Sequence, residues 1–174
     1  MKIYLACTVR GDRGGVAAGR AICERLQTLG HDVLTTHLLA DNVDQAESVL
    51  VEADVFRRDL AWLESCDVLV AEASGSSYGV GFEVGYVLSR ATTTGQRAVV
   101  LYNVARRHAI SRVITGNCDP NCTTFGYASI EELIALIDRQ FAVPQTVKTG
   151  TAENAKDAEQ NSSPRSLRAP RSNL

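Results

Sequence analysis

The chain has 174 residues, of which 45% are apolar, and it carries a net charge of −2. This length fits one domain with a real hydrophobic core, and the charge balance lacks the basic field with which proteins attract nucleic acid. No apolar run approaches the roughly 20 residues of a membrane span, and Met1 leads directly into a strand-like segment rather than a signal peptide. We therefore expect a cytoplasmic location, with the nucleus as an alternative, and neither a membrane nor a nucleic-acid partner.

The predicted elements alternate along the chain. Short β-branched runs are separated by longer segments in which apolar residues recur every three or four positions, which is typical of parallel βαβ units. The expected strands are residues 2–9, 31–38, 67–73, 97–103 and 122–128, and the expected helices are residues 15–29, 44–65, 78–91, 105–114 and 129–141. Ser129 and Glu132 are placed to form a capping box on the last helix.

This pattern predicts the α/β class: a doubly wound, five-stranded parallel sheet with helices on both faces, in a single Rossmann-like domain over residues 1–143. Residues 144–174 contain no aromatic residue and three of the four prolines, so we expect a disordered tail. Ligands of such sheets bind beyond the carboxyl ends of the strands. The loops after the first and third strands are therefore the places to look for a site.

The first of these loops is suited to an anion. Between the strand and the helix, it offers backbone N–H groups, the Thr8 hydroxyl and the guanidiniums of Arg10 and Arg13. Neither a Walker sequence nor the glycine spacing of a dinucleotide fold is present, which argues against ATP hydrolysis and NAD chemistry. The alternative is an ordinary turn with solvated arginines.

The second loop leads into Glu83. Gly79 and Gly81 allow close backbone approach, and we expect Glu83 in the first turn of the following helix, on the inward face shared with Val80 and Val87. The helix dipole would keep it ionised, as a nucleophile must be. The alternative is a glutamate that only complements that dipole.

A second inward carboxylate is Asp59, which shares an apolar stripe with Phe56, Trp62 and Leu63, while its neighbour Arg58 is expected to face elsewhere. Burial there would favour the protonated form and allow Asp59 to donate a proton. The alternative is an aspartate tied to a backbone amide or an arginine. Taken alone, Tyr4 in the first strand is expected to be a core residue.

The sequence gives little support for a metal site or for catalysis by a cysteine thiol. The three histidines lack the spacing of metal ligands, and Cys118-x3-Cys122 has no second pair, so neither a metal site nor a cofactor is expected. The five cysteines are an odd number, and most lie in or beside apolar segments, so we expect reduced thiols.

Three segments together resemble a known family. IYLACTVRGDR, RRDLAWLESCDVLVAEASGSSYGVGFEVGYVLSRA and HAISRVITGN are similar to the 2'-deoxynucleoside 5'-phosphate N-hydrolases of the nucleoside 2-deoxyribosyltransferase family, in order, from residue 2 to about residue 142. The resemblance implies a catalytic domain at residues 1–143 that cleaves the N-glycosidic bond of a deoxynucleoside 5'-monophosphate. The products would be the free base and 2-deoxyribose 5-phosphate.

The resemblance also implies roles for particular residues. Glu83 would be the nucleophile that forms a glycosyl intermediate, Asp59 would assist departure of the base, and Tyr4 would orient the nucleophile. The implied substrate-binding residues are Cys7, Thr8, Val9, Arg10, Gly11, Asp12, Arg13, His37, Ser77, Gly79, Gly81 and Ser111. Ser111 would come from a second subunit, which implies a homodimer. Cys7 stands where relatives usually have glycine, and Asp12 replaces another small residue.

Other functions compete with this interpretation. A deoxyribosyltransferase would pass the sugar to another base, and a ribonucleotide hydrolase would differ only in accepting a 2'-hydroxyl. A non-catalytic nucleotide-binding module would have no need for the Tyr4, Asp59 and Glu83 set. A cytokinin-type phosphoribohydrolase would carry a PGGxGT signature, which the sequence lacks.

Overall fold

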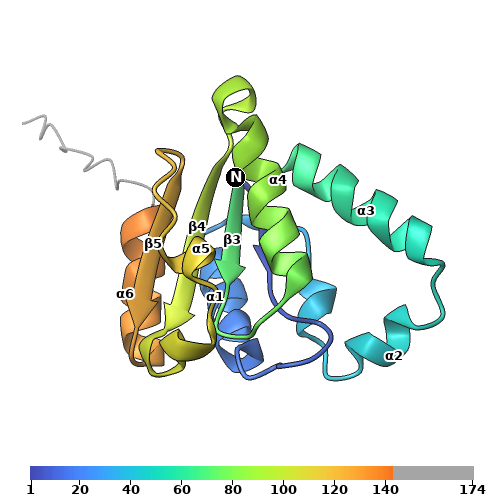
Figure 1. Ribbon diagram of the computed structural model, residues 1–174, viewed down its shortest axis with the longest axis horizontal. Helices are drawn as coiled ribbons and strands as arrows, with labels where there is room; N and C mark the ends of the chain where they lie inside the picture. Colours follow the sequence, from blue (N-terminus) through green and yellow to red (C-terminus); the bar gives the residue numbers. More distant parts are fainter. Residues whose placement is uncertain (143–174) are drawn as a thin grey trace, which may run out of the picture. The chain divides into compact units, whose positions relative to one another are not determined.

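The computed structural model describes residues 1–142, and within that span no helix has the length and apolarity needed to cross a bilayer. The sheet consists of β1 (Lys2–Ala6), β2 (Asp32–Val33), β3 (Val68–Glu72), β4 (Arg97–Asn103) and β5 (Cys122–Tyr127). All pairs are parallel, in the order β2-β1-β3-β4-β5 (Figure 1). The predicted fold class is confirmed, whereas the tail predicted for residues 144–174 lies outside the described residues.

Helices cover both faces of the sheet because strand side chains alternate in direction. Ile3 and Leu5 of β1 pack with α1 (Val16–Thr28) and α6 (Ile130–Phe141) in one core. Tyr4 and Ala6 point to the opposite face, where α3 (Glu52–Ser65) and α4 (Tyr78–Thr94) form a second core. The alternation within β1 therefore directs Tyr4 toward α4.

The second strand is much shorter than predicted. The Thr35 hydroxyl donates to Leu5 O at 2.7 Å and accepts from Leu5 N at 3.0 Å, so it takes the place of a backbone partner for β1. The chain then turns into the 3-10 helix η1 (Thr36–Leu39). A side chain that satisfies the neighbouring strand ends β2 after two residues.

Two predicted helices are each divided. Residues 44–65 form α2 (Val43–Glu47) and α3, separated where Val51 has extended backbone. Residues 105–114 form the 3-10 helix η2 (Val104–Ala109) and the start of α5 (Arg112–Thr115), separated by extended Ile110 and Ser111. At α6, Ser129 caps Glu132 N as predicted, but the Glu132 carboxylate accepts from Ala128 N instead of Ser129 N.

The strand order places a switch point between β1 and β3. The connection from β1 runs through α1 to β2 on one side, and the connection from β3 runs through α4 to β4 on the other. The two loops therefore diverge above their strands and leave a crevice between them, which is where ligands bind in open α/β sheets.

A buried carboxylate connects the carboxyl ends of three strands. Glu72, at the end of β3, is 1% exposed and accepts hydrogen bonds from Tyr127 Oη at 2.7 Å and from the Ser74 hydroxyl. Ser74 Oγ in turn accepts from Asn103 N at 2.8 Å. Burial raises the pKa of Glu72, and the hydroxyl donors oppose that rise. The network fixes the ends of β3, β4 and β5 relative to one another.

Removing one donor from this network should destabilise the fold. We expect Tyr127→Phe to lower the free energy of unfolding by about 1–3 kcal/mol, because a buried carboxyl group loses a hydrogen bond. The measurement is urea unfolding followed by circular dichroism. Tyr102→Phe is the matched control, since the Tyr102 hydroxyl makes no hydrogen bond within residues 1–142, and it should change the free energy much less. Equal effects of the two substitutions would contradict the role of Glu72.

Candidate active site

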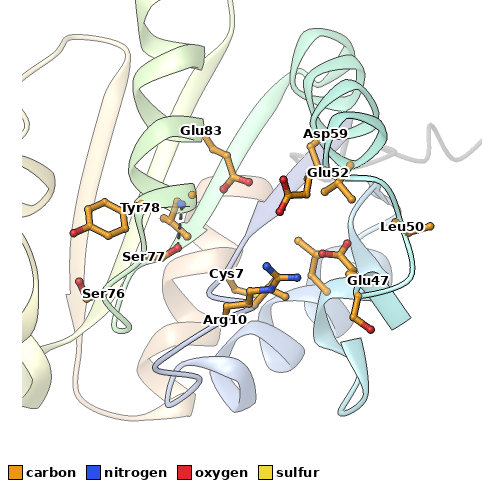
Figure 2. Close-up of a pocket in the computed structure, with 16 residues that line it drawn as sticks. Cys7, Arg10, Glu47, Leu50, Glu52, Asp59, Ser76, Ser77, Tyr78 and Glu83 are labelled. Atoms are coloured by element: carbon orange, nitrogen blue, oxygen red, sulfur yellow. Dashed lines mark hydrogen bonds between the residues drawn. The ribbon is translucent and has the colours of Figure 1, made fainter. Parts of the chain in front are cut away.

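A cavity of about 710 Å³ lies at the switch point. It is bounded by the loop after β1, the start of α4, the segment around α2 and one face of α3 (Figure 2). Its lining residues are Cys7, Val9, Arg10, Leu38, Glu47, Ser48, Leu50, Glu52, Val55, Asp59, Ser76, Ser77, Tyr78, Gly79, Val80 and Glu83. Both carboxylates singled out from the sequence, Asp59 and Glu83, are among them.

Glu83 enters the cavity from the second turn of α4, because the helix begins at Tyr78 and Ser77 is its N-cap. The prediction of a first-turn position was therefore wrong, although the inward face shared with buried Val80 and Val87 is confirmed. Burial raises the pKa of Glu83 to about 7, and the hydrogen bond from Tyr4 opposes the rise. The expectation that the helix dipole keeps Glu83 ionised does not fit this environment.

Within residues 1–142, the side-chain hydrogen bond that holds Glu83 comes from Tyr4. The phenol is fully buried under α4, and its Oη donates to Glu83 Oε1 at 2.7 Å. Burial first, and then the negative charge of Glu83, raise the pKa of Tyr4 far above its ordinary value. The phenol therefore remains protonated and serves as a permanent donor to the carboxylate.

Asp59 faces the cavity from α3, across from Glu83, and Figure 2 shows both carboxylates pointing into the same space. Its Oδ1 accepts from Arg58 Nε at 2.8 Å, and the two side chains are each 25% exposed. The expectation that Arg58 faces elsewhere was wrong, and the alternative of an arginine-bound aspartate describes the site.

The other end of the cavity offers groups for an anion. Ser77 caps α4 by accepting from Val80 N at 3.3 Å, and the N–H groups of the first turn open toward the cavity beside Gly79. Arg10 lines the same region, with its Nε 3.0 Å from Asp44 Oδ1 in an exposed ion pair. Burial raises the pKa of Cys7 to about 12, so its thiol is a neutral wall of the cavity.

Several predicted binding residues shape the first loop without lining the cavity. Thr8 is buried, with Oγ1 3.5 Å from Gly75 O, and Arg13 donates to Val9 O and Ala40 O. Asp12 pairs with Arg106, and Gly11 has a φ of +96° that favours glycine. Gly81 of α4 is also absent from the lining. Thr8, Gly11, Asp12 and Arg13 therefore hold the loop after β1 in place and do not line the cavity.

The two loops meet closely at Gly75. A Cβ atom at this position would lie 2.3 Å from the backbone oxygen of Asp12. Only glycine therefore allows the loop after β3 to pack against the loop after β1.

His37 and Ser111 also lie outside the lining. The His37 ring packs 5.3 Å from Trp62, and its buried Nε2 makes no hydrogen bond within the described chain, with Glu47 Oε1 3.5 Å away. Ser111 is exposed and caps α5 by accepting from Val113 N at 3.3 Å. His37 therefore lies beside the cavity wall, and Ser111 faces outward.

Sequence reasoning missed most of the wall opposite the loops. The missed lining residues on that wall are Leu38, Glu47, Ser48, Leu50, Glu52 and Val55, and Tyr78 at the start of α4 was missed as well. Glu52 and Val55 precede Asp59 by seven and four positions, so helical spacing could have placed them on one face of α3. The contribution of α2 had no such signal, because it depends on the break between α2 and α3.

Comparison with known proteins identifies the family. The family model "Nucleoside 2-deoxyribosyltransferase" matches residues 3–161. The chain belongs to the nucleoside 2-deoxyribosyltransferase family. A relative from Thermofilum pendens, provisionally named a 2'-deoxynucleoside 5'-phosphate N-hydrolase, is 38% identical over 79% of this chain and 93% of its own length. The mouse 5-hydroxymethyl-dUMP N-hydrolase is 31% identical over 87% of this chain and 86% of its own.

Solved structures agree on the fold. A CMP N-glycosidase from Clostridium botulinum superposes with a TM-score of 0.58 at 16% identity, covering 80% of this chain and 99% of that protein. A 2-deoxyribosyltransferase from Bacillus psychrosaccharolyticus gives a TM-score of 0.52 at 18% identity, covering 79% and 96%. Within residues 1–142, no cluster of His, Cys, Asp or Glu is arranged to hold a metal ion.

The raised pKa of Glu83 makes the free energy of unfolding depend on pH. Because the pKa in the folded protein lies above the ordinary value of 4.5, the protonated group favours folding, and this contribution is lost as the pH rises to about 7. Glu83→Gln mimics the neutral group and still accepts a hydrogen bond from Tyr4. We expect it to exceed the native protein in free energy of unfolding by up to about 3 kcal/mol near pH 8.

Urea unfolding between about pH 5 and about pH 8 measures this difference, which should grow with pH. Glu24→Gln, at an exposed position of α1, is the control for loss of a carboxylate from the surface. A Glu83→Gln protein less stable than the native one at about pH 8 would show that the folded state does not disfavour the charged form.

Proposed function

We propose that this protein hydrolyses the N-glycosidic bond of deoxynucleoside 5'-monophosphates to the free base and 2-deoxyribose 5-phosphate. The observation that carries the proposal is the pair of carboxylates facing one cavity, with Glu83 held by Tyr4 at 2.7 Å and Asp59 on the opposite wall. The names of the Thermofilum pendens and mouse relatives support the same reaction.

The arrangement suits a two-step displacement. An oxygen of ionised Glu83 attacks C1' of the sugar as the bond to the base breaks, and the electron pair of that bond leaves with the base. Tyr4 donates to Glu83 and fixes which oxygen is free to attack. Asp59 faces the departing base, and water then releases the sugar from Glu83. Two carboxyl groups on opposite sides of the reacting carbon serve retaining glycosidases in the same way.

In our proposal, the 5'-phosphate binds at the start of α4. Ser77, Gly79 and Arg10 line this end, and the first-turn N–H groups of a helix bind anions readily. However, the lining contains Glu47, Glu52, Asp59 and Glu83 against the single cation Arg10. A dianionic phosphate would meet a largely negative cavity, so further positive or hydrogen-bonding groups are needed.

A second copy of the chain supplies such groups in our proposal. Ser111 lies beside an open hollow lined by Arg107, His108 and Arg112, with Val104 and Ile110 as apolar neighbours. This surface combines a hydroxyl, positive charge and apolar contact area, as needed to cover an acidic cavity mouth. We propose a homodimer in which Ser111 of each chain completes the phosphate site of the other.

The reaction is tested by incubating the purified protein with deoxynucleotides, ribonucleotides and unphosphorylated nucleosides, and by measuring free base by chromatography. We expect base release from deoxynucleoside monophosphates, and none by Glu83→Gln. Adding a second free base tests for exchange, which a transferase would catalyse. A panel with no base release, or a Glu83→Gln protein with near-normal turnover, would overturn the proposal.

The shared site predicts a specific effect of Ser111→Ala. A hydrogen bond to a charged phosphate contributes about 1.5–3 kcal/mol, so the affinity for a deoxynucleoside monophosphate should fall roughly 10- to 150-fold. The unphosphorylated nucleoside should be almost unaffected. Ser89→Ala, at an exposed position of α4, is the control.

Mixing variants tests whether the serine acts across subunits. A heterodimer of Ser111→Ala and Glu83→Ala chains has one site with both residues intact, so at a low concentration of deoxynucleoside monophosphate the mixture should be more active than either variant alone. Failure to recover, or full activity of a monomer at dilution, would contradict the sharing of Ser111.

A further inference from the structure

The Arg106 guanidinium joins the two loops that border the candidate active site. Arg106 lies in η2, and its Nε donates to Ser74 O, in the loop after β3, at 3.1 Å. Its Nη2 donates to the Asp12 carboxylate, in the loop after β1. One planar fork makes both contacts, which fixes the direction of each partner. The three residues are called the Arg106 clamp.

Asp12 carries the clamp into the backbone of the first loop. Its Oδ1 accepts from Gly14 N at 2.9 Å, while its Oδ2 accepts from Arg106. A Cβ atom on Gly14 would overlap the guanidinium, so Arg106 occupies the space that a side chain would fill there. Both carboxylate oxygens are therefore engaged, and the loop after β1 is tied to η2 through them.

Ser74 gives the clamp a fixed anchor. Its hydroxyl donates to buried Glu72 and accepts from Asn103 N at 2.8 Å. Arg106 therefore attaches the loop after β1 to an edge of the sheet that buried hydrogen bonds already hold.

Both clamped loops lead to groups at the proposed phosphate end of the cavity. Asp12 follows Arg10 by two positions, and Ser74 precedes Ser77 by three. Arg10 and Ser77 line the cavity, whereas the three residues of the clamp do not. The clamp therefore lies outside the cavity and acts on two of its lining residues through short stretches of backbone.

The exposure of the clamp favours a local role. The side chains of Arg106 and Asp12 are 36% and 42% exposed. Ion pairs as exposed as this one contribute little to the free energy of unfolding. What the pair determines is the arrangement of the two loops.

We propose that Arg106 is a positioning residue that holds the two loops so that their lining groups converge on the 5'-phosphate of the substrate. This inference rests on the proposed function and extends it to a residue outside the cavity. Loops that already have the binding arrangement lose less conformational freedom when the ligand binds, which raises the affinity.

Positioning and charge predict opposite effects of Asp12→Asn. By charge alone, loss of an acidic group beside the phosphate end should strengthen binding of the phosphate. If Asp12 positions the loop, the same substitution should weaken binding. Asparagine can still accept from Gly14 N, but it presents an N–H group to Arg106 where the carboxylate had an oxygen.

The probe is 2-deoxyribose 5-phosphate, which has no glycosidic bond and binds without turnover. NMR titration measures its affinity for the native protein, for Asp12→Asn and for Arg106→Gln. We expect each variant to bind it about 10- to 100-fold more weakly, because small misplacements of binding groups have effects of this size. The double variant should lose no more affinity than Arg106→Gln alone, because both residues act through one contact.

Arg25→Gln is the matched control. Arg25 forms an ion pair with Asp138 in which the two side chains are 34% and 35% exposed, and neither residue lines the cavity. Its affinity for the probe should remain that of the native protein. Urea unfolding should show similarly small losses of stability in Arg25→Gln and Arg106→Gln. If Arg106→Gln does not fold, Asp12→Asn still gives the sign of the effect.

Turnover gives the second readout. The KM for a deoxynucleoside monophosphate should rise in Arg106→Gln with kcat little changed, because the phosphate is held alike in the substrate and in the transition state. A lower kcat at unchanged KM would overturn the proposal. So would unchanged or tighter binding of the probe by Asp12→Asn, equal weakening in Arg25→Gln, or no binding by the native protein. Absence of base release alongside the expected affinities would defeat the proposed function and support the role of Arg106.

Discussion

The hydrogen bond from Tyr4 to Glu83 joins the sheet to the helix that carries the proposed nucleophile, and the rest of the candidate site is arranged around it. The bond forms because β1 directs Tyr4 toward α4 and because α4 carries Glu83 in its second turn, on the face toward the sheet. Both elements flank the switch point, so the bond is made at the base of the cavity. Burial of Glu83 at this position raises its pKa to about 7.

The site divides its work between two carboxylates in different surroundings. Glu83 is desolvated by burial and bonded to a phenol, whereas Asp59 is bonded to a guanidinium. Environments that separate two acids in this way also assign them different roles in catalysis. The negative balance of the cavity lining is the physical reason for the proposed homodimer, in which the basic hollow beside Ser111 would supply positive charge to the phosphate site of the other chain.

The sequence predicted what depends on local periodicity. The alternation of strand-like and helical segments was enough to predict the parallel sheet and its two loops, and helical spacing predicted the inward side of Glu83. The length of β2 could not be predicted, because the Thr35 hydroxyl bonds to Leu5, thirty residues away in the chain. The contact between Arg58 and Asp59 was missed because adjacent residues of a helix are expected to face different ways. The second bond of Arg58, to Glu47, joins α3 to α2 across a break that the sequence did not predict.

A covalent bond between Glu83 and the sugar is the most direct consequence of this arrangement. It is tested by rapid acid quenching of the protein with a deoxynucleoside monophosphate whose base leaves readily, followed by mass spectrometry of the peptides. The expected result is an adduct of the mass of 2-deoxyribose 5-phosphate less water, on the peptide that contains Glu83, and absent from Glu83→Gln. Base release without any adduct on that peptide, at a turnover unchanged by Glu83→Gln, would contradict it.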